Sequence, residues 1–421
     1  MLNSVSYFFF LVFFIETGMT LLIEVLEHKH SQRLLSTLIQ GSDRLEERDA
    51  EAKALARRTL QCRVNIVRKV TQDVAFLVLI LSGAIVVWLD LCKTLQLPFP
   101  VEAAVYFLGL WLLFYMLELG IACYRERMLM PSYGISREKS GSILKDWFKG
   151  GLSWVAVIIG LTIPTVWVIC TFPDFWWAVG WLVAIPVQFY LTVLCPAIVE
   201  PLALKLESLE DSPVTKKIKR LAEQRRLANI TIHRMRRTNS LPLPGAFCVG
   251  LGPGRRIVLP DAVMEALSPE EILAIVAHEF GHLKSRHILL SFLLGCTVSM
   301  LVLYLSFLIL NWTAFYEAFN FEAAALLPSL FVVGVFWRKV GSLARPLYVC
   351  LLRTFETQAD AYAAQAMGRG KPLAEGLRKS AILQGNDFPR HPLYALFHVT
   401  HPTLDKRVTL MNNADNNSPV T

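Results

Sequence analysis

The sequence predicts a mainly α-helical membrane protein with seven transmembrane helices and one small α+β segment. The first observation is the composition: 54% of the 421 residues are hydrophobic and only 18% are charged. A soluble domain carries about 25% charged residues to solvate its surface, so this chain has too little polar surface for that class. Seven apolar stretches and an alternating placement of positive charge are the second and third observations. The same composition excludes an intrinsically disordered chain.

Each predicted transmembrane helix is an apolar stretch of about 20 residues, the length that crosses about 30 Å of hydrocarbon. The seven stretches cover 5–26, 74–92, 103–123, 152–172, 176–199, 288–312 and a segment that begins at Ala323. The first is not expected to be a cleaved signal peptide, because no Lys or Arg precedes it and no small-residue cleavage site follows. The last contains Arg338 and Lys339. We expect either a long helix toward Leu352 with these charges facing protein or water, or charges that snorkel.

Positive charges alternate between the two sides of the predicted membrane. The short connections hold 10 Lys and Arg after the first stretch and 6 after the third, against 1 after the second and none after the fourth and sixth. Because positive residues are retained on the cytoplasmic side, this pattern predicts an outside N-terminus and a cytoplasmic C-terminus. The net charge of +8 is therefore mainly a sign of topology, and no nucleic-acid partner is expected.

The polar segment 201–287 between the fifth and sixth stretches follows a different pattern. It contains one basic helical stretch and three short β-like runs, at 216–227, 230–234, 246–250 and 256–259. A helix follows, and its start is well marked. Ser268 can cap the helix, Pro269 suits the first helical position, and Glu271 completes a capping box with Ser268.

This helix carries an H-E-x-x-H motif made of His278, Glu279 and His282. Residues four apart lie on one face of a helix, so both imidazoles can bind one ion. Zn²⁺ is the natural ion for two imidazoles plus a carboxylate, and it lowers the pKa of a bound water to about 7. Glu279 is placed to take a proton from that water. A helix that carries two incidental histidines is the alternative interpretation, and a third ligand decides against it.

The third ligand is expected after the seventh stretch, where Glu356 and Asp360 lie four residues apart in a helical pattern. Glu356 can complete a His, His, Glu set, and Asp360 can orient a ligand imidazole. A solvated acidic face is the alternative. The charge count favours the metal site, because it places 201–287 and 346–421 on the same side of the membrane. We therefore predict one zinc ion per chain.

Several motifs, spread over nearly the whole chain, are shared with one protease family. They lie at 256–259, 278–282, 355–361 and 400–407, with a weaker match at 133–136 and 146–149. In combination they resemble the type I CAAX prenyl proteases, membrane zinc metalloproteases of the gluzincin clan that are related to heat-shock-type membrane zinc proteases. The resemblance implies seven helices around a large water-containing chamber, with Glu16, Asp90 and Glu118 either facing that interior or lying at the membrane interface. It implies zinc ligands at His278, His282 and Glu356, a general base at Glu279, and Asp360 as a partner of a ligand.

Two late residues receive a role from the resemblance alone. It places His401 and Arg407 near the substrate carbonyl, where a cationic or hydrogen-bonding group stabilises developing negative charge. From the residues themselves, His401 could also be a capping or surface histidine. Arg407 could also pair with Asp405 or with a lipid phosphate.

One motif departs from the family. Its members typically carry Asn-Ala-Phe or Asn-Ala-Tyr on the edge strand beside the metal, whereas this sequence has Gly245, Ala246 and Phe247, with Asn239 six residues before Gly245. An edge strand can still hold an extended peptide through main-chain hydrogen bonds, so Ala246 and Phe247 are expected to bind substrate. Because Gly245 replaces the Asn of the family, this departure puts in question how the substrate backbone is aligned.

The sequence thus predicts a zinc metalloendopeptidase that acts on membrane-associated or lipidated, CAAX-type proteins at the cytoplasmic membrane face. A quality-control protease without CAAX specificity, a non-enzymatic polypeptide-binding protein with structural zinc, and a transporter are the alternatives. A bacterial inner membrane is favoured over the endoplasmic reticulum. The predicted order is helix one (1–26), cytoplasmic loop (27–73), helices two and three (74–123), cytoplasmic loop (124–150), helices four and five (151–200), metalloprotease segment (201–287), helices six and seven (288–345) and C-terminal protease part (346–421).

Overall fold

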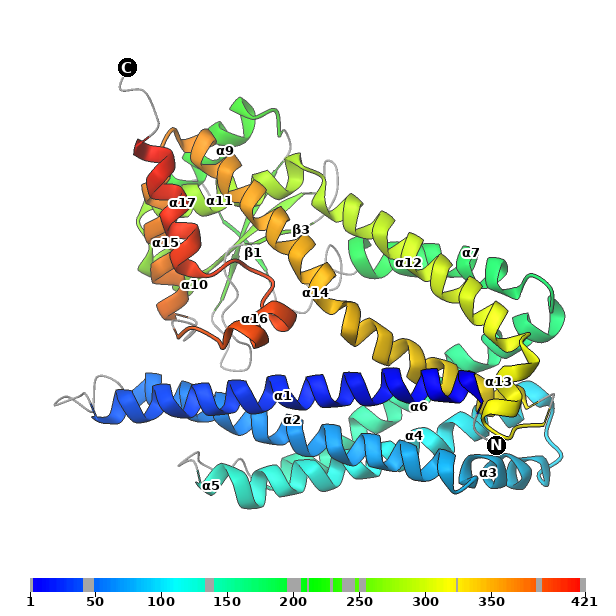
Figure 1. Cartoon of the computed structure of the whole chain (residues 1–421). Helices are drawn as coiled ribbons and strands as arrows, with labels where there is room; N and C mark the ends of the chain where they lie inside the picture. The colour runs from blue at the N-terminus through cyan, green and yellow to red at the C-terminus, as the bar shows by residue number, and fades with distance from the viewer. Residues whose placement is uncertain are drawn as a thin grey trace. The chain divides into compact units, whose positions relative to one another are not determined.

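A computed structural model shows a mainly helical chain, as the sequence predicts (Figure 1). The structure describes residues 3–40, 49–132, 140–194, 206–209, 212–227, 230–236, 247–249, 255–322, 325–383 and 388–416. The chain forms two compact units. Unit 1 comprises Met1–Leu182, Ser299–Arg345 and Arg390–Tyr394, and unit 2 comprises Val183–Val298, Pro346–Pro389 and Ala395–Thr421.

Unit 1 is built from long apolar helices. It holds α1 (Ser4–Gln40), α2 (Asp49–Leu81), α3 (Ala84–Lys93), α4 (Phe99–Tyr124), α5 (Met130–Ser132), α6 (Ser140–Thr171), α13 (Thr313–Ala318) and parts of α7 (Trp176–Phe189), α12 (His287–Leu310) and α14 (Leu326–Met367). Helices α1 and α2 lie side by side (Figure 1). Their contact includes the stacked rings of Phe13 and Phe76, whose centroids lie 5.3 Å apart. Aromatic and aliphatic side chains together form the core of the unit.

Five of the described helices are long and apolar enough to cross a membrane. They are α1, α4 with its π-helical continuation to Leu129, α6 from Trp147, α12 and α14. The bent pair α2 and α3 makes six if it counts as one span, and the segment Trp176–Thr192 within the predicted fifth stretch is shorter. The chain is therefore a multi-pass membrane protein whose described residues hold five to six long apolar helices, and the count of seven stays a prediction.

The predicted second stretch is bent at Gly83. Helices α2 and α3 meet there at 68°. Gly83 has φ +72°, a left-handed conformation that is easily adopted only by a residue without a Cβ atom. Its amide still donates to the carbonyl of Ile80 at 3.3 Å, which helps to close the end of α2. The bend therefore follows from one glycine inside an otherwise helical apolar stretch.

Lys339 and its acidic partners form a buried ionic cluster in unit 1. Helix α14 runs on without a break through Lys339, whose side chain is 1% exposed. The Lys339 ammonium lies 2.8 Å from Glu16 and 2.8 Å from Asp73. Lys69 lies 2.5 Å and 3.1 Å from the same two carboxylates, and the Thr17 hydroxyl donates to Asp73 at 2.6 Å. Two cations thus balance two anions, and of the expected alternatives Lys339 faces protein.

The other acidic residues of the apolar stretches have different surroundings. Glu118 accepts hydrogen bonds from Arg68 and Gln72 at 2.9 and 2.8 Å. Asp90 is 63% exposed at its side chain and pairs with Lys93 at 3.1 Å. Of Glu16, Asp90 and Glu118, only Glu16 belongs to the buried ionic cluster. Its lysine partners explain how a carboxylate is tolerated in this apolar stretch, and a water-filled chamber is not needed for that.

The described residues of unit 2 form a four-stranded mixed sheet with the order β1, β2, β4, β3. The strands are β1 (Glu207–Ser208), β2 (Thr231–Met235), β3 (Phe247–Val249) and β4 (Arg256–Pro260). Strand β2 runs parallel to β4, whereas β3 runs antiparallel to β4 and lies at the end of the sheet. The three β-like runs of the sequence are confirmed within about one residue, and β1 was not predicted.

Helices pack on this sheet around one apolar core. They are α9 (Pro213–Gln224), α10 (Asp261–Ala266), α11 (Pro269–Lys284), α15 (Lys371–Leu383) and α17 (Leu404–Asn416), with part of α14. Parts of α7 and α12, and the residues of α16 (Pro392–His398) from Ala395 onward, also belong to unit 2. Ile257 and Leu259 of β4 share the core with Val276 and Phe280 of α11, and all four side chains are fully buried. The apolar face of α11 is therefore fixed against the sheet, which leaves its polar face for the site.

Candidate metal centre

The start of α11 is fixed by the predicted capping box. The Ser268 hydroxyl accepts from the amide of Glu271 at 3.3 Å, and the Glu271 carboxylate accepts from the amide of Ser268 at 2.8 Å. Pro269 occupies the first helical position. Lys379 of α15 also donates to Glu271 at 2.8 Å. Cap and ion pair together set where the helix begins, and so where its histidines point.

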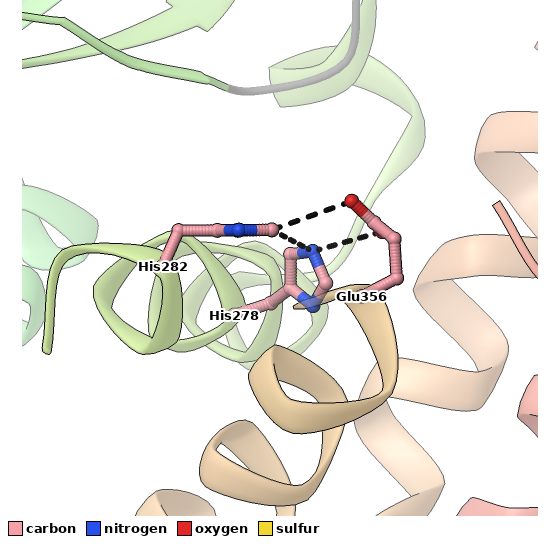
Figure 2. A group of neighbouring side chains, drawn as sticks. All are labelled: His278, His282 and Glu356. Carbon is pink, nitrogen blue, oxygen red and sulfur yellow. Dashed lines mark hydrogen bonds and ion pairs between the residues drawn. The ribbon is translucent and has the colours of Figure 1, made fainter. Parts of the chain in front are cut away.

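Three side chains from two helices converge in unit 2, as Figure 2 shows. The Nε2 atoms of His278 and His282 on α11 lie 3.1 Å apart. The Glu356 carboxylate on α14 lies 3.5 Å from Nε2 of His278 and 3.4 Å from Nε2 of His282. His278 and Glu356 are 7% and 9% exposed, so two of the three groups are buried.

The spacing of these atoms fits a tetrahedral metal ion. Ligand atoms at about 2.0–2.1 Å from zinc in tetrahedral directions lie about 3.3 Å from one another. The three separations of 3.1, 3.4 and 3.5 Å bracket that value. A metal ion is implied by this donor set, because three lone-pair donors this close together, two of them buried, repel one another unless a cation or protons lie between them.

Close approach of α11 and α14 is what brings Glu356 to the histidines. Gly281 of α11 faces Ala359 of α14, whose side chain and backbone are fully buried. A Cβ atom on Gly281 would lie 2.8 Å from Cα and 3.0 Å from the carbonyl oxygen of Ala359. Only glycine allows this contact, because the opposing atoms belong to backbone and cannot swing away.

We expect Gly281→Ala to weaken metal binding by at least tenfold. The added methyl group must push α11 from α14, which moves both histidines relative to Glu356 and destabilises the fold by about 1–3 kcal/mol. Zinc affinity measured by competition with a chelating dye checks this. Gly341→Ala on α14 is the matched control, since nothing lies within 4 Å of its Cβ position. Equal zinc affinity of both variants would contradict the role given to the helix contact.

Asp360 and Arg407 form a buried pair beside His278. Oδ1 of Asp360 lies 2.8 Å from Nδ1 of His278, and Asp360 is 1% exposed. Arg407 of α17 donates to both oxygens of Asp360 at 2.8 and 2.6 Å. Its guanidinium also lies 3.7 Å from Glu356. The protein partner of Arg407 is therefore Asp360, which the sequence pattern did not indicate.

His401 lies beside Glu356. Its Nδ1 atom is 2.8 Å from Oε2 of Glu356, and its side chain is 59% exposed. Arg353, one turn before Glu356, donates to the carbonyls of Ala395 and Val399 at 2.6 and 3.0 Å. A cation at the C-terminal end of α16 is favourable because the last carbonyls of a helix lack partners. Helix α14 therefore also holds the segment that leads to His401.

Glu279 lies between the metal group and the sheet edge. Burial raises the pKa of its carboxyl above the usual range, although His278 and His282 lower it in part and the backbone of Cys248 hydrogen-bonds to it. Cys248 belongs to the end strand β3, and burial raises the pKa of its thiol to about 12, so this cysteine is protonated. A carboxyl with a raised pKa suits a group that takes up a proton and returns it near neutral pH.

The predicted substrate strand is described in part. Phe247 lies on β3 opposite Val258 of β4, while Ala246, Gly245 and Asn239 lie outside the described residues. The weaker motif at 133–136 lies outside them too.

Sequence reasoning missed His287 and Gln358. His287 contacts two residues of the site through its ring nitrogens: Nδ1 lies 2.9 Å from Nδ1 of His282, and Nε2 lies 2.9 Å from Oε1 of Gln358. The only available signal was a third histidine five residues after the motif, and a continuous helix would turn it away from His282.

Long apolar helices together with a His, His, Glu group beside a carboxyl base define a membrane metalloprotease. The family model "Peptidase family M48" matches residues 208–414, and "CAAX prenyl protease N-terminal, five membrane helices" matches residues 43–205. The chain belongs to this family of CAAX prenyl protease-type M48 peptidases.

Individual relatives agree with the family. "CAAX prenyl protease 1 homolog" of Arabidopsis thaliana is 24% identical over 71% of this chain and 70% of the relative. "Uncharacterized metalloprotease YhfN" of Bacillus subtilis is 22% identical over 68% and 67%. The solved structure "Crystal Structure of S. mikatae Ste24p" has a TM-score of 0.73 at 20% identity and covers 95% of this chain and 99% of that one, so the fold is shared.

Proposed function

We propose that the chain is a zinc-dependent endopeptidase that hydrolyses peptide bonds of membrane-associated or lipidated, CAAX-type substrates at the cytoplasmic membrane face. The observation that carries the proposal is the set of three metal-ligating side chains next to Glu279. Two imidazoles and one carboxylate favour zinc over magnesium or calcium, which prefer oxygen ligands. His278, His282 and Glu356 would hold the ion, one per chain.

The reaction assigns a separate task to each neighbouring residue. Bound zinc supplies a Lewis acid that polarises the scissile carbonyl and lowers the pKa of water. Glu279 takes the proton of the attacking water and later donates it to the leaving amine. His401, exposed beside Glu356, donates a hydrogen bond to the developing oxyanion. Arg407 stabilises the same developing negative charge through its guanidinium, which lies near Glu356. It also holds Asp360 against His278.

The sheet edge supports a peptide substrate. Strand β3 pairs with β4 on one side and is the last of the described strands in the sheet order, so its other side suits main-chain pairing with an extended chain. We assign this contact to the main chain of Ala246 and Phe247. Cys248, the next residue, contacts Glu279 through its backbone. A peptide on this edge would therefore lie beside the general base.

The substrate should be associated with a membrane. Helix α11 ends at Lys284 and the apolar helix α12 begins at His287, so the metal group lies within a few residues of a candidate span. We retain the proposed topology of seven spans around a chamber, with an outside N-terminus and the protease segments 201–287 and 346–421 on the cytoplasmic side. A bacterial inner membrane is favoured, and no nucleic acid is involved.

Two peptides that differ only in a farnesyl group test the substrate class. The purified protein in nanodiscs should cleave the farnesylated CAAX peptide with a kcat/KM at least tenfold above that of the unmodified peptide, and Glu279→Gln should cleave neither. Equal rates on both peptides and on an unfolded transmembrane reporter would support quality control without CAAX specificity. Absence of chelator-sensitive cleavage of all three would contradict the endopeptidase.

Metal binding should release a proton from His278. Burial lowers the pKa of this imidazole, but Asp360 and Glu356 outweigh that effect and raise it to about 9. In chelator-stripped protein the proton is therefore held at pH 7, and zinc must displace it. Zinc affinity should rise about tenfold per pH unit from pH 6 to 8 and level off above pH 9. Calorimetric titrations in buffers of different ionisation enthalpy count the protons, and affinity independent of pH in this window would contradict the prediction.

A further inference from the structure

His287 is the first residue of α12, and it contacts the metal group from outside. It is 4% exposed, and its ring lies parallel to that of Phe355, with centroids 4.1 Å apart. Its two nitrogens join His282 on α11 to Gln358 on α14, each at 2.9 Å. We propose that His287 is a positioning residue that fixes the ring and tautomer of His282 and so presents Nε2 of His282 to the metal. The inference rests on the metal centre of the proposed function.

A break between two helices makes this contact possible. Residues five apart in a continuous helix point about 140° apart, so His287 could not reach His282. Helix α11 ends at Lys284, and Arg286 adopts φ +56°, a left-handed conformation that a residue with a side chain seldom takes. The chain turns at this point and returns His287 to the side of His282. A strained residue is kept where it places a side chain against the metal group.

Gln358 determines the direction of the hydrogen bonds that link it to His287 and His287 to His282. Oε1 of Gln358 can only accept, so Nε2 of His287 donates to it. A neutral imidazole with a proton on Nε2 has its lone pair on Nδ1, so Nδ1 of His287 accepts from Nδ1 of His282. His282 then has no proton on Nε2, the atom that lies 3.1 Å from Nε2 of His278.

The opposite direction would block the site. If the Gln358 amide presented its NH₂ group, His287 would carry its proton on Nδ1 and donate it to His282, which would place a proton on Nε2 of His282. That nitrogen could not bind a metal. His278 reaches the required tautomer in another way, because the acceptor Asp360 lies 2.8 Å from its Nδ1. The two ligand histidines thus have unlike partners, one an anion and the other a neutral imidazole.

Three substitutions of His287 and its neighbour separate positioning from packing. His287→Phe keeps a ring against Phe355 and removes both nitrogens, whereas His287→Asn keeps an acceptor close to the place of Nδ1. Phe355→Leu removes the ring contact and keeps the nitrogens. Each full-length variant is stripped with chelator, and zinc affinity is measured by competition with a chelating dye, together with the melting temperature of the metal-free protein.

We expect His287→Phe to bind zinc about 10–100-fold more weakly, the usual effect of losing a partner of a metal-ligating histidine. His287→Asn should recover at least half of that loss on a logarithmic scale. Phe355→Leu should lower the melting temperature and leave zinc affinity within threefold. Gln358 is exposed, so two further variants remain informative if His287→Phe does not fold: Gln358→Glu should bind zinc at least as tightly as wild type, and Gln358→Leu more weakly.

Two results at position 287 would overturn the inference alone. They are zinc affinity of folded His287→Phe within threefold of wild type, and Asn no better than Phe at this position. For the Gln358 pair, Glu binding more weakly than Leu would have the same meaning. A wild-type protein that takes up no zinc would contradict the proposed function itself, which is a separate and distinguishable outcome.

Discussion

Replacing Glu279 with Gln is expected to lower kcat for peptide cleavage by about 10²–10⁴-fold, the range that general acid-base catalysis contributes. Gln has the shape of Glu but cannot take a proton from water or return it to the leaving amine. Because Glu279 is not one of the three ligating groups, zinc should stay bound at one ion per chain. The measurement is steady-state cleavage of a reporter peptide, with zinc content determined on the same preparations.

The Glu279→Gln result is informative only if the variant is folded and loaded. Its metal-bound melting temperature should lie close to that of wild type, and KM should change little, since the carboxyl acts in the chemical step rather than in peptide binding. Substrate that remains uncleaved on the variant can be isolated and identified. A variant that cleaves as fast as wild type would exclude Glu279 as the base.

Replacing Lys339 with Met should have the largest effect on stability, about 3–5 kcal/mol of the free energy of unfolding, because one member of a buried charged group is removed and its partners stay. Lys69 would then be the one buried cation that contacts both Glu16 and Asp73 among the described residues, with the exposed Arg338 3.7 Å from Asp73. Methionine keeps most of the volume of lysine, so the loss comes from charge rather than from a cavity. Denaturant unfolding in detergent micelles measures it.

Two further variants isolate the charge effect. Arg338→Met is the matched control, since this neighbour is 52% exposed and lies 3.7 Å from Asp73, and its loss should change stability by less than about 1 kcal/mol. The double variant Lys339→Met with Asp73→Asn restores neutrality and should recover at least half of the loss. Equal destabilisation by Lys339→Met and Arg338→Met would show that the buried cluster contributes no more than a surface pair.

Local patterns in the sequence predicted most of the fold. The capping box at Ser268 and Glu271 depends on residues three apart, and it was confirmed. Apolar stretches likewise depend on consecutive residues, so the long helices were found. The bend at Gly83 depends on a left-handed glycine conformation that an apolar pattern does not reveal. For α14 the sequence left two expectations open for Lys339, and the distant partners Glu16 and Asp73 decide between them.

The candidate site shows the same division. His278, Glu279 and His282 follow from helical spacing, and Glu356 and Asp360 follow from a second helical pair on the same side of the predicted membrane. The structure brings the three predicted ligands together. The hydrogen bond from Arg407 to Asp360 joins residues 47 apart in the sequence, and the contact of His287 with Gln358 joins residues 71 apart. The contact of His287 with His282 is short in sequence but crosses the break between two helices. Those contacts required the fold.

Zinc titration of chelator-stripped protein tests the central claim most directly. Cleavage of a reporter peptide should be lost on stripping and return in proportion to added zinc, with saturation at one ion per chain. Glu356→Gln should need far more zinc for the same recovery, since it removes an anionic ligand. Stripped wild-type protein that cleaves the peptide at the untreated rate would contradict a catalytic metal held by His278, His282 and Glu356.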